Sequence, residues 1–244
     1  MTEAGAEWAL ELTGVSKEFP VGARALDGIS LRLARGRLAA LVGPNGSGKT
    51  TVLKLLAGLI RPTSGTVRVG GHAAGSVPAR AGLGYLPETP DYPGWLTGRE
   101  LLRHLGRLSG LDGAGLDEAI ARRAAWAGLR AVLDRPAQTY SSGQRQRLGL
   151  AQALLHDPAL VLLDEPAAAL DPGGIAGLAD LLRRLRAERR TVVLSSHFLP
   201  QVEATCDHAW LLRAGRLIWE GDPTGAVALS QRFIELAPED VAAG

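Results

Sequence analysis

A glycine-rich segment early in the chain has the spacing of a phosphate-binding loop. Residues 43–50 read GPNGSGKT and fit the pattern G-x-x-x-x-G-K-[ST] at every fixed position. Glycines let the backbone fold close around a phosphate, so that successive N–H groups and a helix N-terminus point at its negative charge. Lys49 adds a positive charge for the β- and γ-phosphates of a nucleotide, and the Thr50 hydroxyl can ligate Mg²⁺. The residues predicted to bind the phosphates are Gly43, Asn45, Gly46, Ser47, Gly48, Lys49, Thr50 and Thr51.

Two adjacent acids, Asp164 and Glu165, follow the apolar run Leu160–Leu163. Such a run is typical of a buried strand, and ligands bind at the carboxyl ends of strands in open α/β sheets. Asp164 is suited to hold Mg²⁺, and Glu165 is suited to polarise an attacking water as a general base. A single acid here could equally cap a core strand, but a pair beside a phosphate loop favours the catalytic interpretation.

A second loop of small polar residues, Tyr140–Gln144, precedes the helical pattern Arg145–Leu155. It places free backbone N–H groups at a helix N-terminus, where negative charge is stabilised. Taken alone, the loop is explained equally well as an ordinary helix cap.

The elements around the phosphate loop are those of a parallel sheet. Leu38–Val42 is a continuous apolar run that predicts a strand buried on both faces, and a helix is expected from Gly48 to about Gly58. Two further strands, Leu160–Leu163 and Thr191–Leu194, flank the helical pattern Ile175–Ala187. Strands that alternate with helices predict a parallel sheet with helices on its faces.

Other segments are predicted to surround this sheet. Leu10–Val15 and Ile29–Leu33 alternate as antiparallel strands, and residues 210–219 are expected to form a hairpin. Glu100–Leu108 and Leu116–Leu129 have helical periodicity with no strand nearby, which indicates an inserted helical subdomain at about 89–156. We expect one domain over residues 1–235 and a short tail at 236–244.

The order of these motifs resembles the ATP-binding-cassette (ABC) ATPase family across almost the whole chain. In that family the second loop usually reads LSGGQ, and here it reads YSSGQ. The resemblance implies that Ser141, Ser142, Gly143 and Gln144 bind the γ-phosphate held by another subunit, with two nucleotides enclosed in a head-to-tail dimer. It also implies an α/β fold, a P-loop NTPase with a mixed or parallel sheet core, an N-terminal antiparallel β subdomain and an inserted helical subdomain.

Three further residues acquire roles from this resemblance. Phe19 occupies the place of an aromatic residue that stacks on adenine, Asp171 that of a loop acid facing the partner subunit, and His197 that of a histidine contacting the γ-phosphate. Without the other motifs, Phe19 would be more typical of a core and His197 of a strand end. The predicted catalytic residues are therefore Lys49, Glu165 and His197, with ATP as the nucleotide and Mg²⁺ as the metal.

Two positions depart from the usual family pattern. Glu88, in the segment Gly84–Glu88, stands where a glutamine is common, and this variant resembles ATPases of ABC-2-type exporters. Its carboxylate can still reach Mg²⁺ or a water, so the predicted metal ligands are Thr50, Glu88 and Asp164. Ser142 stands where the second loop usually has glycine, and we expect it to crowd the γ-phosphate slightly and to change the affinity.

Composition bears on the partners and the compartment. The chain has 27 basic and 25 acidic residues, and the basic ones are scattered, so we expect no nucleic-acid partner. One cysteine, Cys206, excludes an internal disulfide framework and fits a reducing compartment. The apolar runs are far shorter than the roughly 18 residues of a membrane-spanning helix, and residues 1–10 do not resemble a secretory signal. We expect a cytoplasmic protein held at the inner face of the membrane by a partner.

The function that these motifs favour is the ATPase half of an ABC-2-type exporter, which energises a separate integral-membrane permease. The segments at 84–88, 98–104, 140–155 and 196–200 look most like the ATPase for copper-site maturation of nitrous oxide reductase. Intact motifs in one chain permit a homodimer. The alternatives are a soluble ABC ATPase for iron–sulfur cluster assembly and a ribosome-associated or DNA-repair ATPase. The last is disfavoured by the lack of a long coiled coil or a basic stripe.

Residues 89–96 form an aromatic and proline-rich stretch that includes Trp95. The family resemblance implies that this stretch contributes to a groove for a short cytoplasmic helix of the permease, and an exposed apolar patch suits such an interface. Inward packing of the same stretch is the alternative.

Overall fold

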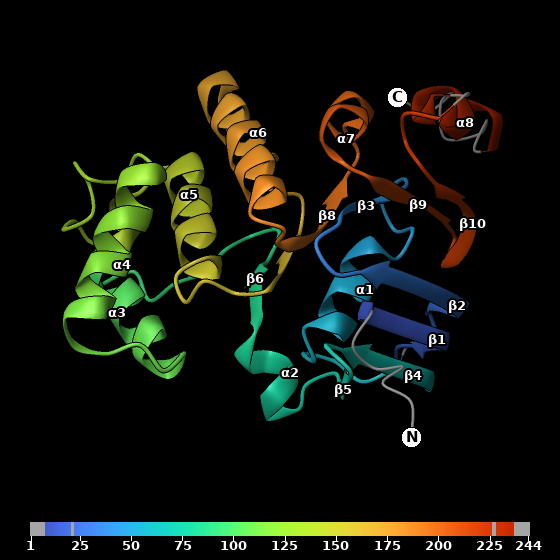
Figure 1. The fold of residues 1–244 in the computed structure, drawn as a ribbon, viewed down its shortest axis with the longest axis horizontal. Coiled ribbons are helices and arrows are strands. Elements are labelled where there is room, and N and C mark those ends of the chain that lie inside the picture. Colours follow the sequence, from blue (N-terminus) through green and yellow to red (C-terminus); the bar gives the residue numbers. More distant parts are fainter. Residues whose placement is uncertain (1–7, 21, 226–227, 237–244) are drawn as a thin grey trace.

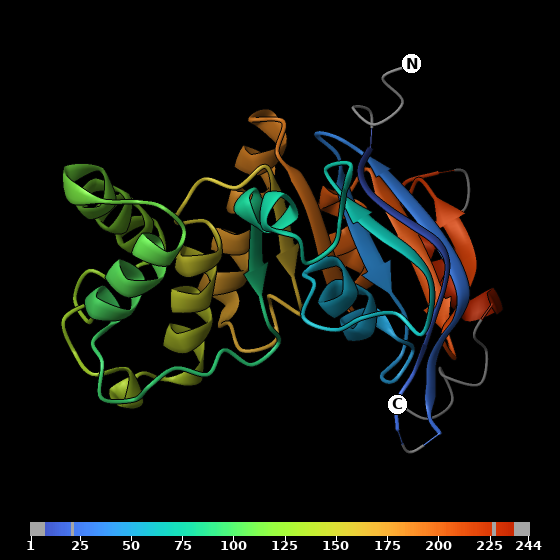
Figure 2. The same cartoon turned by 90° about the horizontal axis from the view of Figure 1, so that it is seen from below.

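The computed structural model describes residues 8–20, 22–225 and 228–236. Two sheets lie toward one end of the molecule and a group of helices lies at the other (Figures 1 and 2). Within the described ranges, every helix is too short or too polar to span a bilayer. The predicted tail at 236–244 lies outside the described residues except for Leu236, the last residue of α8 (Leu229–Leu236).

The N-terminal sheet is antiparallel, with the strand order β2-β1-β4-β5. Its strands are β1 (Trp8–Glu18), β2 (Arg24–Ala34), β4 (Ser64–Val69) and β5 (His72–Ala73). The two strands predicted here are confirmed and are longer than predicted. The sequence pattern missed β4, since Val67 and Val69 are its only buried residues, and β5 is only two residues long.

The second sheet has six strands in the order β10-β9-β3-β8-β7-β6. The strands are β3 (Leu38–Val42), β6 (Leu83–Leu86), β7 (Leu160–Leu163), β8 (Thr191–Ser196), β9 (His208–Arg213) and β10 (Arg216–Gly221). Only the β9–β10 pair, the predicted hairpin, is antiparallel. Strands β3, β7 and β8 are buried at every position. Burial on both faces explains the uninterrupted apolar sequences of β3 and β7. Strand β8 also buries Ser195 and Ser196, which lie beyond the predicted end at Leu194.

Helix α1 (Lys49–Leu56) packs between the two sheets. Its Val52, Leu53, Leu55 and Leu56 share one apolar core with the inward faces of β1 and β2 and with Leu41 of β3. Each leucine buried in this way contributes about 1.5–3 kcal/mol relative to an exposed one. The packing fixes α1, and therefore the loop before it, against the ends of the strands.

The opposite face of the six-stranded sheet is covered by helices. They are α5 (Ser142–Ala153), α6 (Pro172–Ala187), α7 (Leu199–Thr205) and α8. Alternation along β3 sends Leu38, Ala40 and Val42 to this second core and Ala39 and Leu41 to the first. The mixed and parallel sheet predicted from the sequence is confirmed.

Helices α3 (Gly98–Leu108) and α4 (Gly113–Trp126) pack with α5 around a third core. Figures 1 and 2 both place α3 and α4 at the end of the molecule away from the antiparallel sheet. Helix α4 begins and ends earlier than the predicted Leu116–Leu129. Asp112 caps its start, and Gly128, with φ of 66°, follows its end in a left-handed conformation that terminates helices. Short helices at Val77–Ala81 (α2) and Ala137–Thr139 complete the described part.

The parallel pairing brings distant segments to one edge of the sheet. Val42 at the end of β3 lies opposite Ser196 of β8, Leu163 of β7 lies opposite Leu194 of β8, and Leu86 of β6 lies opposite Leu163. The segments that follow these four strands therefore meet at one place.

Candidate functional site

The phosphate loop turns sharply into α1 at Gly48. Gly48 has φ of 107°, and a Cβ atom there would lie 2.6 Å from the Leu26 side chain and 2.8 Å from the Ala25 carbonyl oxygen. A residue with a side chain would therefore be both strained and crowded. Because glycine has no side chain with which to cap a helix, the first N–H groups of α1 remain open to a ligand.

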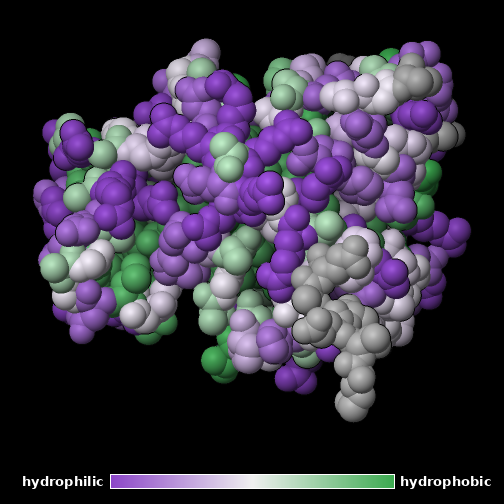
Figure 3. Space-filling model, viewed as in Figure 1, coloured by the Kyte–Doolittle hydropathy of each residue, from purple (hydrophilic) through white to green (hydrophobic). Residues whose placement is uncertain are grey.

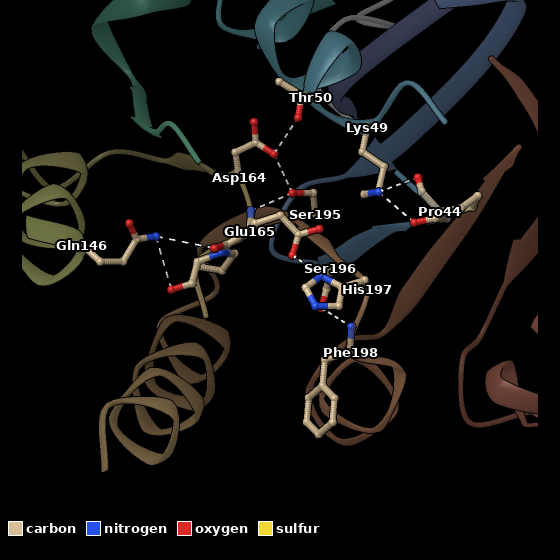
Figure 4. Close-up of polar contacts among 12 residues, drawn as sticks. Pro44, Lys49, Thr50, Gln146, Asp164, Glu165, Ser195, Ser196, His197 and Phe198 are labelled. Atoms are coloured by element: carbon tan, nitrogen blue, oxygen red, sulfur yellow. Dashed lines mark hydrogen bonds and ion pairs between the residues drawn. The ribbon is translucent and has the colours of Figure 1, made fainter. Parts of the chain in front are cut away.

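Lys49 is the first residue of α1, and its side chain folds back over the loop. Its Nζ donates hydrogen bonds to the carbonyl oxygens of Gly43 at 2.7 Å and Pro44 at 3.0 Å (Figure 4). Burial lowers the pKa of the ammonium group, while the charges of Glu165, Asp164 and Glu88 act in the opposite direction. A phosphate would be a stronger, charge-assisted partner for this ammonium than two neutral carbonyl groups.

Asp164 is buried beneath the loop and has two hydroxyl partners. Its Oδ1 accepts hydrogen bonds from Thr50 Oγ1 at 3.1 Å and from Ser195 Oγ at 2.7 Å (Figure 4). Its other oxygen, Oδ2, is buried and has no hydrogen-bond partner among the described residues. A buried carboxylate oxygen in that situation calls for a ligand or ion.

These oxygens fit Mg²⁺, which binds carboxylate and hydroxyl oxygens. In the part of the chain that the structure describes, no group of three or more His, Cys, Asp or Glu side chains could hold a metal. Mg²⁺ commonly takes only one or two protein carboxylates and completes its shell with phosphate oxygens and water. Thr50 and Asp164 therefore suit a metal that arrives with a nucleotide.

Glu165 and His197 form a pair at the edge of the same site. His197 Nδ1 lies 2.9 Å from Glu165 Oε2 (Figure 4). The Glu165 N–H donates to Ser195 Oγ at 2.7 Å, and the side-chain amide of Gln146 in α5 reaches the Glu165 carbonyl oxygen at 3.5 Å. The backbone of Glu165 is therefore held by β8 and α5, while its carboxylate contacts His197 and lines the pocket described next.

An open pocket of about 440 Å³ joins these groups. Its lining residues are Ala25, Asn45, Gly46, Ser47, Gly48, Lys49, Thr50, Thr51, Glu88 and Glu165. Apart from Ala25, all of them belong to the predicted set. Gly43 contributes its carbonyl oxygen to Lys49, and Asp164 and His197 join through their contacts with Thr50 and Glu165.

The second predicted loop lies outside the lining of this pocket. Ser141 Oγ accepts from the Gln144 N–H at 3.2 Å, and Gln144 Oε1 accepts from the Ser141 N–H at 3.0 Å, so the two residues form a capping box at the start of α5. The Tyr140 hydroxyl donates to the Val132 carbonyl oxygen at 2.7 Å and anchors the loop to the helical region. The capping interpretation is observed, and contact with a nucleotide stays a prediction for Ser141, Ser142, Gly143 and Gln144.

Asp171 and Phe19 also lie outside the lining of the phosphate-loop pocket. Asp171 caps α6 by accepting from the Gly174 N–H at 3.0 Å, and Arg147 of α5 donates to it at 2.6 Å. That backbone hydrogen bond, aided by Arg147, lowers the pKa of the carboxyl group. Phe19 is 38% exposed and therefore not a core residue, and Lys17 Nζ lies 5.1 Å from the centre of its ring.

Sequence reasoning missed Ser195, Gln146 and Arg147. Each is polar and lies two or three residues from a predicted site residue, which was the available signal. Their partners come from other elements, however, and depend on how the strands and helices pair.

A glycine loop between a buried strand and a helix, with a metal-suited acid at the end of a neighbouring parallel strand, defines a P-loop nucleotide-binding protein. The ABC transporter family matches residues 26–168. The chain belongs to this family.

Similar proteins agree with this assignment. ABC transporter ATP-binding protein YxlF of Bacillus subtilis (strain 168), itself uncharacterized, is 40% identical over 81% of this chain and 66% of its own length. Nod factor export ATP-binding protein I of Sinorhizobium fredii (strain NBRC 101917 / NGR234) is 38% identical over 91% of this chain and 65% of its own length. The chain thus spans just under two thirds of each of these relatives.

Solved structures with the same fold include the ATP-binding subunit of an ABC transporter. It has a TM-score of 0.86 and 28% identity, and the match covers 93% of this chain and 99% of that one. A bacterial ABC transporter cassette described as dimeric has a TM-score of 0.80 and 25% identity, covering 87% of this chain and 98% of that one.

Proposed function

We propose that this chain binds ATP with Mg²⁺ and hydrolyses it as one half of an ABC exporter, energising a separate membrane permease. The observation that carries this proposal is the convergence of Lys49, Thr50–Asp164 and Glu165–His197 on one pocket. These are the groups that phosphoryl transfer to water requires: a cation at the phosphates, a metal site and a base. We further propose that residues 1–235 form one ATPase domain with 89–156 as its helical insertion.

In the proposed mechanism, the loop N–H groups and Lys49 bind and orient the phosphates of ATP. When bound, Mg²⁺ would be held by Thr50 and Asp164, with Glu88 at the pocket wall as a further candidate, and would neutralise phosphate charge. Glu165 accepts a proton from the attacking water. His197 holds the Glu165 carboxylate in place through its Nδ1 contact and is exposed enough to reach the γ-phosphate.

We propose that two such chains close around two nucleotides. Ser141, Ser142, Gly143 and Gln144 at the tip of α5 would complete the site of the partner, and Asp171 would lie beside them. The location of this loop outside its own pocket supports the idea, as does the likeness to a cassette described as dimeric. A homodimer is sufficient, because one chain carries every motif.

The permease is proposed to dock in the groove beside residues 89–96. A cavity of about 470 Å³ is lined there by side chains that include Pro90, Tyr92, Leu96 and Leu105. Tyr92 and Leu96 pack against the helical core, whereas Trp95 is 76% exposed. The stretch is therefore packed inward in part, with one large aromatic side chain left outside. Figure 3 shows apolar side chains on both sides of the indentation between the helical region and α2.

Trp95→Ala tests this docking. We expect weaker co-purification with the permease and unchanged ATP binding, since Trp95 does not line the nucleotide pocket. Ile234→Ala in α8 is a matched control, because it also removes an exposed apolar side chain, 55% exposed, but from a different helix. Equal recovery of the permease with both variants would remove Trp95 from the interface.

The exporter itself is tested by co-expression with a candidate permease, and a polytopic membrane protein encoded next to this chain would be the first choice if there is one. Formation of a complex and stimulation of Mg²⁺-dependent ATP hydrolysis are expected. We propose that the complex serves export and, more narrowly, copper-site maturation of nitrous oxide reductase. We also propose that the permease holds this chain at the cytoplasmic face of the membrane. A complex with soluble scaffold proteins in place of a permease would instead favour iron–sulfur cluster assembly.

A further inference from the structure

Ser195 is a hydroxyl-bearing residue in the middle of the molecule. It belongs to β8, where every residue is buried, and its own side chain has no exposed surface. A buried hydroxyl group is costly unless both its donor and its acceptor functions find partners. The identity of those partners therefore shows what the residue does.

Both partners of Ser195 are site residues carried by the turn after β7. Its Oγ–H donates to Asp164 Oδ1 at 2.7 Å, and its Oγ accepts from the Glu165 N–H at 2.7 Å (Figure 4). One hydroxyl group thus connects the proposed metal ligand to the backbone of the proposed base. Parallel pairing of β7 and β8, with Leu163 opposite Leu194, places it there.

The backbone of Glu165 needs such support. Its φ is 43°, in the left-handed region that residues other than glycine rarely adopt. Conformations of this kind persist where the surroundings hold them, and they concentrate at active sites. Here the turn directs the carboxylate of Glu165 toward His197 and the pocket.

Ser195 also constrains the rotation of the Asp164 carboxylate. Together with Thr50 it occupies Oδ1, so that Oδ2 is the oxygen left without a partner among the described residues. This is the oxygen available to a metal ion. The orientation of a metal-binding carboxylate is commonly fixed by such outer hydrogen bonds.

We infer that Ser195 is a positioning residue that sets both carboxylates of the site, Asp164 for Mg²⁺ and Glu165 for water, without touching the nucleotide. The inference rests on the proposed ATPase function. It assigns to β8 a catalytic contribution that is separate from that of His197, the residue that follows the strand.

Ser195→Ala removes the hydroxyl group and can be compared with Thr191→Ala in the same strand. Thr191 is also a buried hydroxyl residue, but it accepts from the Gly36 N–H at the opposite end of β8. For Ser195→Ala we expect kcat and the affinity for Mn²⁺ to fall by about 10-fold to 100-fold, as is typical for outer-shell partners. The KM for ATP should change much less. Ser195→Thr, which keeps the hydroxyl group, should recover most of the loss.

Mn²⁺ binding is measured by electron paramagnetic resonance with a non-hydrolysable ATP analogue, and thermal unfolding is recorded for each variant. Thr191→Ala should lower Tm while keeping the kcat and Mn²⁺ affinity of the parent protein. If Ser195→Ala behaves in the same way, the hydroxyl group is only structural and the inference is wrong. Should Ser195→Ala not fold, Ser195→Cys, with a similar volume and a weaker donor, decides by the same two measurements.

Measurements on the parent protein distinguish failure of the proposed ATPase function from failure of the role of Ser195. Failure of the parent chain to bind or hydrolyse ATP with Mg²⁺ would overturn the proposed function itself. An active parent together with parent-like Mn²⁺ affinity in Ser195→Ala would overturn the role of Ser195 alone.

Discussion

The phosphate loop before α1 and the serine-bearing loop before α5 are both helix N-termini, but they satisfy their polar groups differently. Gly48 offers α1 no side-chain cap, and the loop lines a pocket beside Thr50, Glu88 and Glu165. At α5, Ser141 and Gln144 cap each other, and their loop lies outside that pocket.

We call the phosphate loop with Thr50, Asp164 and Glu165 the α1 half of the site, and the loop Ser141–Gln144 the α5 half. The difference between the two loops indicates which half one chain can complete by itself. The α1 half has a buried cation, a metal-suited carboxylate oxygen and a base around one pocket, so we expect it to bind a nucleotide without a second chain. The α5 half has already used part of its hydrogen-bonding capacity on itself. We expect it to bind phosphate only when a second chain presents one, with Ser142 and Gly143 contributing the N–H groups that the capping box leaves open.

We expect the largest overall effect from removing the cation of the α1 half, because both ATP binding and ATP hydrolysis should suffer. Lys49→Ala leaves the loop without its ammonium group, and we expect ATP hydrolysis to fall by at least about 10²-fold, the cost of losing one strong stabiliser of developing charge. ATP binding, measured with a fluorescent analogue, should weaken as well. Lys54→Ala is the control, because Lys54 lies on the exposed side of the same helix. Full activity in Lys49→Ala would show that this pocket is not the site of ATP hydrolysis.

Glu165→Gln separates binding from turnover within the α1 half. The amide can still accept a hydrogen bond but cannot accept a proton, so we expect turnover to fall by about 10²- to 10⁴-fold while ATP binding survives. With ATP bound and not hydrolysed, two chains should stay together as a dimer. Size-exclusion chromatography with and without ATP measures this, and an active variant would remove Glu165 as the base.

The sequence was sufficient for the strands that are apolar at every position, whereas β8 is buried throughout but extends past the predicted Leu194 to Ser196. Strands β3 and β7 begin and end where predicted because strands buried on both faces are apolar throughout. Strand β4 and helix α7 gave no comparable pattern, since β4 is largely exposed and α7 has only seven residues.

Most residues that line the candidate pocket were predictable from the sequence, but the contacts between them were not. The fixed spacing of the glycine loop and the adjacent acids at 164 and 165 indicated phosphate and metal chemistry. The hydrogen bonds of Ser195, by contrast, depend on the pairing of β7 with β8 across some 30 residues of chain. A serine near the end of a buried strand has the same local sequence whether or not it faces a carboxylate.

Ser141→Ala tests the α5 half. Removing the Ser141 hydroxyl group that caps α5 should lower the free energy of unfolding by about 1 kcal/mol. If the loop also contacts the nucleotide of a partner, turnover should fall by about 10-fold through the loss of a hydrogen bond to a charged group. ATP binding by one chain should not change.

Asp112→Ala is the matched control for Ser141→Ala, because Asp112 caps α4 in the same helical region. It should lose comparable stability without loss of turnover. Equal turnover in the two variants would mean that Ser141 is a cap only, and the comparison between the two halves would lose its dimeric interpretation.

The smallest expected effect concerns the contact between Arg147 of α5 and Asp171 at the start of α6, at 2.6 Å. Asp171 is well exposed, so the pair should contribute no more than about 1 kcal/mol to the stability of one chain. If the two residues move together when a second chain binds, Arg147→Ala and Asp171→Ala should each lower turnover by about 5-fold, the equivalent of 1 kcal/mol. The double variant should then lose little more than either single variant, because the coupled contact is already broken. Fully additive losses of turnover in the double variant would show that Arg147 and Asp171 act independently. The loops before α5 and α6 would then contribute separately to turnover.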